Sequence, residues 1–133
     1  MEPITTSAMI GGIVSFLGIK LSKDKSINSF LSEFSEATVN WIKPLFLKED
    51  GTENEIIQDL KDKPESPARK KAVESAIERA LEEDASAEKH IKEMFQQMSK
   101  VEEGGKIVNY IINSIQTITG NTTGNINQTY NGK

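Results

Sequence analysis

The chain has no cysteine and a single histidine among its 133 residues. The lack of cysteine excludes disulfide bonds and thiolate metal sites, and one histidine cannot build a multi-histidine zinc site. The motifs of nucleotide-binding loops, zinc proteases and serine hydrolases are missing too. We therefore expect a protein that is not an enzyme and binds no cofactor or metal, with His90 at the rim of a helix.

Clustered positive charge is scarce as well. Sixteen Lys and Arg residues stand against twenty Asp and Glu, and the one short run of adjacent bases, Arg69–Lys71, is flanked by Glu65 and Glu74. Binding to the phosphate backbone of a nucleic acid depends on clustered Lys and Arg side chains that displace counterions. We therefore do not expect nucleic acid as a partner.

Long hydrophobic runs are absent. The most apolar segment, Ile4–Ile19, is sixteen residues long and contains Gly11 and Gly12, whereas a membrane-spanning helix needs about 20 residues. Glu2 also stands where a signal peptide would carry bases. These features favour a buried first helix and a cytoplasmic location. Membrane insertion stays open as an alternative, and it would use these residues: Ile10, Ile13, Val14, Phe16 and Leu17.

What the sequence does contain is helical periodicity. Apolar residues predict a first helix within Ile4–Leu21, capped by Thr6 or Ser7 and ending near Gly18. The clearest stripe runs from Ile27 to Phe46 in steps of three and four. Pro44 removes a backbone donor within it, so this helix should end or kink near Trp41 to Lys43.

Three further helix starts follow along the chain. Thr52 and Glu55 have the spacing of a capping box, and the helix that they open should end before Pro64. Ser66 followed by Pro67 predicts an N-cap and a first helical residue. Ser86 is expected to cap the last helix. The prediction is an all-α protein, a compact bundle of four to five helices over residues 1–103.

The C-terminal segment has another composition. All acidic residues lie at or before Glu103, and Gly104–Gly105 predicts a boundary between the bundle and a tail at 104–133. The isoleucines of residues 106–118 fit a helix, but Ile, Val, Thr and Tyr favour strands. A strand or cross-β segment is the preferred interpretation, with a helix or disorder as alternatives. A chain truncated after Glu103 should then stay folded and become monomeric.

Stacked copies of such a tail can join Asn, Gln and Thr side chains in hydrogen-bonded ladders while Ile and Tyr interdigitate. We therefore predict self-association through the tail. A flexible linker, or a hairpin that pairs with the bundle, is the alternative. The predicted contact residues are Ile115, Gln116, Ile118, Asn121, Asn125, Ile126, Asn127, Gln128 and Tyr130.

Several stretches resemble small helical domains of bacterial conflict, or immune-like, systems. They are "MEPIT", "NWIKPLFLKE", "AVESAIERALEED" with "AEKHIKEMFQ", and the tail "NSIQTITGNTTGNI". In that family a helical module precedes an amyloid-like or RHIM-like signalling motif, which in longer relatives connects to an effector such as a protease. Residues 115–120 are similar to the RHIM core, although two extra residues separate Gln116 from Gly120.

The resemblance implies a signalling adaptor of a bacterial defence system whose partners are copies of itself or an effector with a matching motif. Two other functions stay open. One is a pore-forming protein that inserts residues 4–19 into a membrane. The other is an inert helical module that binds a partner and carries a disordered tail.

Overall fold

The computed structural model describes residues 5–122, and for residues 115–122 it describes the backbone alone. This part of the chain is all-α and contains no strand, but it has seven α-helices where four or five were expected. A short 3-10 turn, η1, precedes the sixth helix. The helices are α1 (Thr6–Asp24), α2 (Ile27–Leu31), α3 (Glu36–Phe46), α4 (Glu55–Asp62), α5 (Pro67–Glu83), α6 (Glu88–Met98) and α7 (Glu102–Thr122), and η1 spans Ala85–Ala87.

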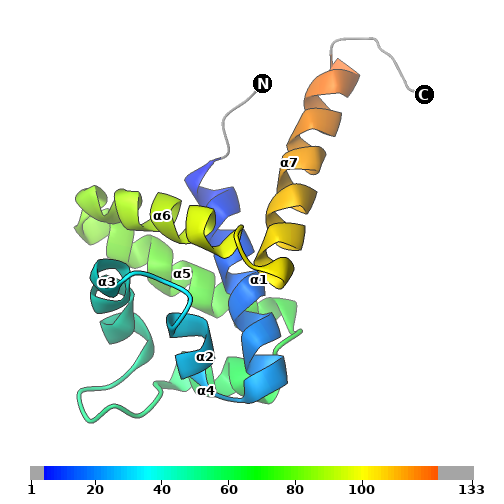
Figure 1. The fold of residues 1–133 in the computed structure, drawn as a ribbon. Helices are drawn as coiled ribbons and strands as arrows, with labels where there is room; N and C mark the ends of the chain where they lie inside the picture. The colour runs from blue at the N-terminus through cyan, green and yellow to red at the C-terminus, as the bar shows by residue number, and fades with distance from the viewer. Residues whose placement is uncertain (1–4, 123–133) are drawn as a thin grey trace.

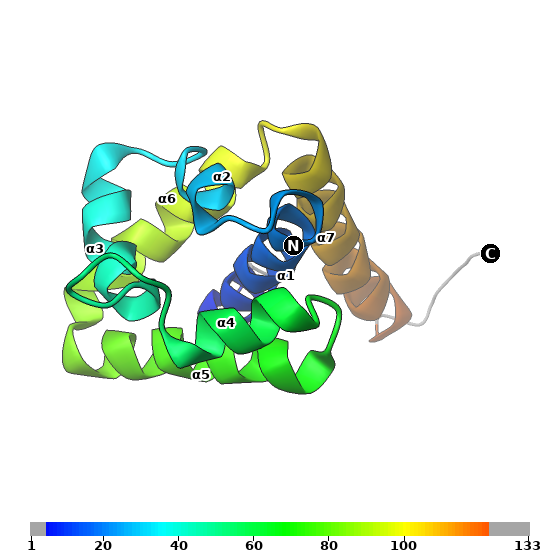
Figure 2. The same ribbon diagram turned by 90° about the horizontal axis from the view of Figure 1, so that it is seen from below.

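Helix α1 runs through the middle of the molecule and contacts α2, α4, α5, α6 and α7 (Figures 1 and 2). Its N-cap is Thr5, whose side chain accepts a hydrogen bond from the Ala8 amide, so the predictions of Thr6 or Ser7 were wrong. The helix also continues past Gly18 to Asp24. It ends where Lys25 adopts a left-handed conformation, with φ of 51°.

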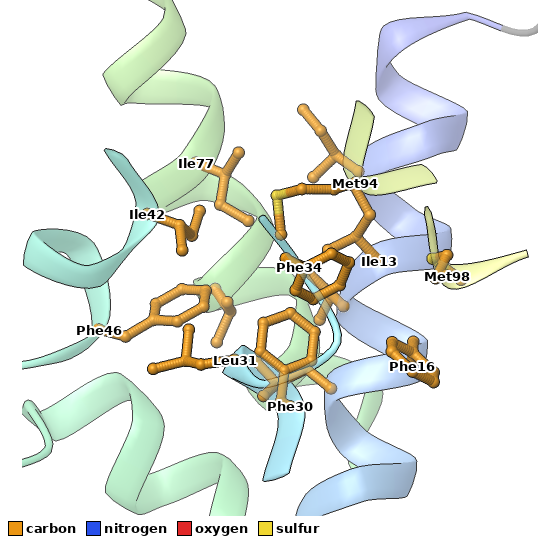
Figure 3. Packing of buried hydrophobic residues seen from close by; sticks show 14 of the residues in the cluster. Ile13, Phe16, Phe30, Leu31, Phe34, Ile42, Phe46, Ile77, Met94 and Met98 are labelled. Carbon is orange, nitrogen blue, oxygen red and sulfur yellow. The ribbon is translucent and has the colours of Figure 1, made fainter. Parts of the chain in front are cut away.

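The core lies along one side of α1. Four phenylalanines meet there, with ring centroids of contacting pairs 4.9–6.2 Å apart: Phe16, Phe30, Phe34 and Phe46. Ile42 and Ile77 approach them from α3 and α5, and Met94 and Met98 from α6 (Figure 3). Each such side chain contributes about 1.5–3 kcal/mol when it is fully buried. Packing of this kind holds the short α2 and α3 in place.

The apolar stripe from Ile27 to Phe46 forms two helices, where the sequence predicted one. The chain turns after Leu31, and Ser35 caps α3 by accepting a hydrogen bond from the Thr38 amide. Two side chains of α6 stabilise this start, because Gln97 accepts from the Ser35 amide and Glu93 from the Thr38 hydroxyl. The spacing of three and four persists across the turn, so periodicity alone did not reveal it.

Pro44 does not end α3 at Trp41 to Lys43; the helix continues to Phe46. The proline lies in the last turn, where its missing amide removes one intrahelical hydrogen bond. Asn54 completes this end, because its side-chain amide donates to the Leu45 carbonyl and its backbone amide to the Phe46 carbonyl. Burial of Phe46 then makes the extra turn favourable.

The other helix starts agree with the sequence to different degrees. Ser66 caps α5 with Pro67 as its first residue, and α4 ends before Pro64, as predicted. The cap of α4 is Asn54, however, because Thr52 bonds to Asp50. Ser86 donates to Asp84 inside η1 and does not cap α6.

Residues 106–118 belong to α7, so the helical alternative describes their backbone, and the preferred strand does not. The helix begins before Gly104–Gly105 and passes through both glycines. A Cβ on Gly104 would lie 2.0 Å from the Met98 carbonyl oxygen, and Val108 is buried at 7% exposure. A cut after Glu103 would remove these contacts from the bundle. The expected tail at 104–133 therefore begins as a packed helix, and residues 123–133 lie outside the described part.

Candidate binding groove

A hollow of about 690 Å³ lies between α1, α5 and α7. Its floor is one face of α1, formed by Ala8, Gly11, Ser15 and Ile19 at helical spacing. Three partly exposed side chains of α7 make the apolar wall, and Glu74 of α5 makes the opposite wall. The α7 residues of this wall are Ile107, Tyr110 and Ile111. We call this feature the α1–α7 groove.

The two neighbouring glycines of α1 differ in what surrounds them. A Cβ on Gly12 would lie 2.8 Å from Ile111 Cδ1 and 3.2 Å from Phe95 Cε1, so this glycine permits α6 and α7 to pack closely. A Cβ on Gly11 would meet nothing within 4 Å. Gly11 therefore presents bare helix backbone to the open side of the groove.

Tyr110 is the most exposed large apolar side chain among the described residues, at 74%. It belongs to the groove wall together with Ile107 and Ile111, which are partly buried against the core. A tyrosine ring offers a large apolar surface with one polar end, and such residues are enriched where proteins bind one another. The wall thus combines a fixed aliphatic base with an exposed aromatic edge.

Three charged side chains, Glu74, Glu103 and Lys106, lie at the rim of the groove. Lys23 pairs with Glu103, and the hydrogen bond that it donates lowers the pKa of the Glu103 carboxyl. Within the described residues neither Glu74 nor Lys106 forms an ion pair. Glu74 of α5 and Lys106 of α7 therefore flank the apolar floor, and neither forms an ion pair within the described part of the molecule.

The hollow continues along α1. A second space of about 330 Å³ shares Ser15, Ile19 and Ile107 with the first and reaches Ser22 and Pro64. From Ala8 to Ser22 the floor is about 21 Å long, because an α-helix rises 1.5 Å per residue. That length accommodates about four turns of another helix.

The residues predicted for self-association do not gather at this groove in the described structure. Ile115, Gln116, Ile118 and Asn121 occupy the last turns of the α7 backbone. The remaining five, Asn125, Ile126, Asn127, Gln128 and Tyr130, lie outside the described residues. The sequence did not single out the groove floor, although two glycines inside the uncharged apolar stretch Ile4–Ile19 were a signal for close helix contact.

The residues expected for membrane insertion lie in the core. Ile10, Ile13, Val14, Phe16 and Leu17 are each at most 1% exposed. Over residues 5–122, no helix combines the length and the apolar character that crossing a bilayer requires. Inserting α1 into a membrane would therefore require the helices around it to separate.

His90 lies at the edge of α6 and stacks on Trp41 of α3, with ring centroids 5.4 Å apart and an interplanar angle of 18°. This packing gives the imidazole a structural contact between two helices. Among the residues whose side chains are described, no three His, Asp or Glu residues come together as metal ligands would.

No protein-family model, curated protein or solved structure matches the chain.

Proposed function

We propose that the protein is a non-enzymatic helical adaptor that associates with copies of itself, or with an effector of a bacterial defence system, through its C-terminal segment. The observation that carries this proposal is the placement of α7. The helix packs on α1 and α6 through its first turns and then extends away from the other helices (Figure 1).

The composition of α7 supports the same proposal. From Ile107 to Thr122 the helix has no charged residue, and Tyr110 is exposed within this stretch. A surface helix that contacts only water usually carries charges on its outer face. An uncharged helix that leaves the bundle is therefore suited to contact another protein.

The form of association differs from the one that the sequence favoured. Residues 115–122 have a helical backbone, so a cross-β stack of Ile115, Gln116, Ile118 and Asn121 would require the end of α7 to unwind. In the helical form, Ile111, Ile115 and Ile118 occupy positions on one face. We propose that this face carries the association and that the predicted contact residues from Asn125 to Tyr130, which lie outside the described part, also take part in it.

The test is the mass of the full chain by analytical ultracentrifugation, from about 1 µM to about 1 mM, a range that covers binding free energies of roughly −8 to −4 kcal/mol. Association should appear as a mass that rises with concentration. Ile118→Asp should weaken it at least about tenfold, because the change places a charge on the contacting face.

Asn109→Asp is the matched control. Position 109 is nine residues from 118, hence about 180° away around the helix, and Asn109 is exposed. The same charge on this face should leave the association unchanged. A full chain that stays monomeric over the whole range would disprove the proposed self-association, and equal effects of the two substitutions would remove the assignment to this face.

A further inference from the structure

We infer that the α1–α7 groove is one half of a two-fold interface, in which the groove of each copy receives α7 of the other. In this arrangement Tyr110 of each copy lies over Gly11 of its partner, and Lys106 pairs with Glu74 across the contact. The inference rests on the proposed self-association and names the surface that carries it.

Gly11 lowers the stability of α1, and nothing within the chain explains why a glycine lies there. Glycine inside a helix is about 1 kcal/mol less favourable than alanine. Gly12 has a reason within the chain, because a methyl group there would lie 2.8 Å from Ile111 Cδ1 and 3.2 Å from Phe95 Cε1. Gly11 has none, since a methyl group there would meet nothing within 4 Å. A close approach from outside the chain supplies the missing reason, as small residues let another helix or ring come near the backbone.

The side chains that line the groove are complementary to one another across a two-fold axis. A two-fold interface uses the same patch on both copies, so each feature of the patch must find its counterpart within that patch. This groove holds an exposed ring, Tyr110, beside an open glycine, Gly11. It also holds an acid, Glu74, and a base, Lys106, that form no ion pair within the described residues. One patch thus contains both members of two complementary pairs.

The helix that fits the groove is α7 of a second copy. The floor is about as long as four helical turns, and the uncharged part of α7, residues 107–122, is about 24 Å long at 1.5 Å per residue. The first hollow has a mostly apolar lining and disfavours a charged helix, because the charges there would lose water without a partner, while Lys23, Glu65 and Lys70 line its continuation. The chain's own α7 has the matching length and polarity, which favours a second copy over an unrelated charged partner.

The first experiment fills the groove. Gly11→Leu places a side chain where the folded chain leaves open space, so the monomer should remain folded. Crowding at both symmetry-related contacts should weaken association at least about a hundredfold. Gln96→Leu is the matched control, because it adds the same side chain to an exposed position on α6 away from the groove.

The second experiment exchanges the charges. Glu74→Lys alone and Lys106→Glu alone each place like charges together in a homotypic pair, and each should weaken association about tenfold. A mixture of the two variants should associate about as tightly as the unchanged protein, because opposite charges then meet at both contacts. Circular dichroism of each variant confirms that the helices are retained.

The outcomes separate the two proposals. If the unchanged protein associates, and neither Gly11→Leu nor the charge exchanges alter this, the groove is not the interface and the proposed function stands. Failure of the mixed variants to recover association would likewise overturn the Lys106–Glu74 contact. A protein that is monomeric at every concentration overturns both the groove interface and the self-association on which it rests.

Discussion

Helices α1 and α7 are the two longest in the described structure, and each contains a pair of adjacent glycines, yet they have opposite relations to the core. Helix α1 is enclosed by five other helices, whereas α7 packs through its first turns on α1 and α6 and then departs. The stretch of α1 from Thr6 to Ile19 carries no charge, which suits a segment that neighbours surround, and its charged residues Lys20, Lys23 and Asp24 lie near its C-terminal end. The distal part of α7 is uncharged too, although its backbone extends away from the other helices (Figure 1).

The two glycine pairs show the difference at single residues. Gly12 and Gly104 each lie where a Cβ would collide with a neighbour. Gly11 lies on the open groove, where nothing within the chain requires a glycine. Three of these positions can therefore be used to separate what the fold needs from what an interface needs.

The largest expected effect comes from truncating matched isoleucines in the two helices. Ile13 of α1 is fully buried, so Ile13→Ala should lower the free energy of unfolding by about 2–5 kcal/mol. Ile112 of α7 is only partly buried, and Ile112→Ala should cost less than about 2 kcal/mol. Urea titrations of the two variants measure both values. Equal losses would mean that α7 is as much a part of the core as α1.

Gly104→Ala should come next. Its Cβ would meet a backbone oxygen, which cannot move aside as the end of a side chain can. We expect a loss of about 3 kcal/mol in the free energy of unfolding, measured by urea titration. Thermal unfolding of the unchanged protein and the variant provides a second readout, and an unchanged midpoint would contradict the packing of α7 on α6.

Gly11→Ala should act in the opposite direction. The methyl group meets no neighbour and alanine favours the helix, so the free energy of unfolding should rise by up to about 1 kcal/mol. The measurement is made at a concentration where the protein is monomeric. A destabilised monomer would show that Gly11 serves the fold, and would remove the main reason for assigning it to an interface.

The smallest expected effect is a change of stability with pH, and it arises at Glu93 of α6, outside α1 and α7. The hydroxyl of Thr38, aided by that of Ser35, donates to Glu93 and lowers the pKa of its carboxyl below the ordinary 4.5. A lowered pKa in the folded state means that the stabilising contribution is present above the unfolded value and is lost as the pH falls through the folded value. Stability should therefore decline somewhat below about pH 4.5, and Glu93→Gln should lack this part of the decline. Urea titrations at several pH values test it.

Much of the fold was readable from the sequence because local signals agreed with packing. Ser66–Pro67 defined a helix start and Pro64 a helix end. The break between α2 and α3 was missed because the apolar spacing continues through it. Pro44 misled because Asn54, far along the chain, satisfies the carbonyls of the turn that follows the proline.

Helix α7 shows why propensity failed at the C-terminus. Ile, Val and Thr favour strands by less than the burial of Val108, Ile107 and Ile111 against α1 and α6 can contribute. The groove could not be predicted, because it joins Gly11, Glu74 and Tyr110 from three helices that only the tertiary structure brings together. The composition of the tail did point to α7 as the unusual part of the chain.

The stacking of Trp41 on His90 has a practical consequence. The chain has one tryptophan, so its tryptophan emission comes from a single junction, the contact of α3 with α6. That junction lies apart from the residues that line the groove. Joining two copies should leave the emission spectrum as it is, whereas loss of the native structure should shift it. The protein thus contains its own optical probe for telling dimer formation from denaturation, with no label attached.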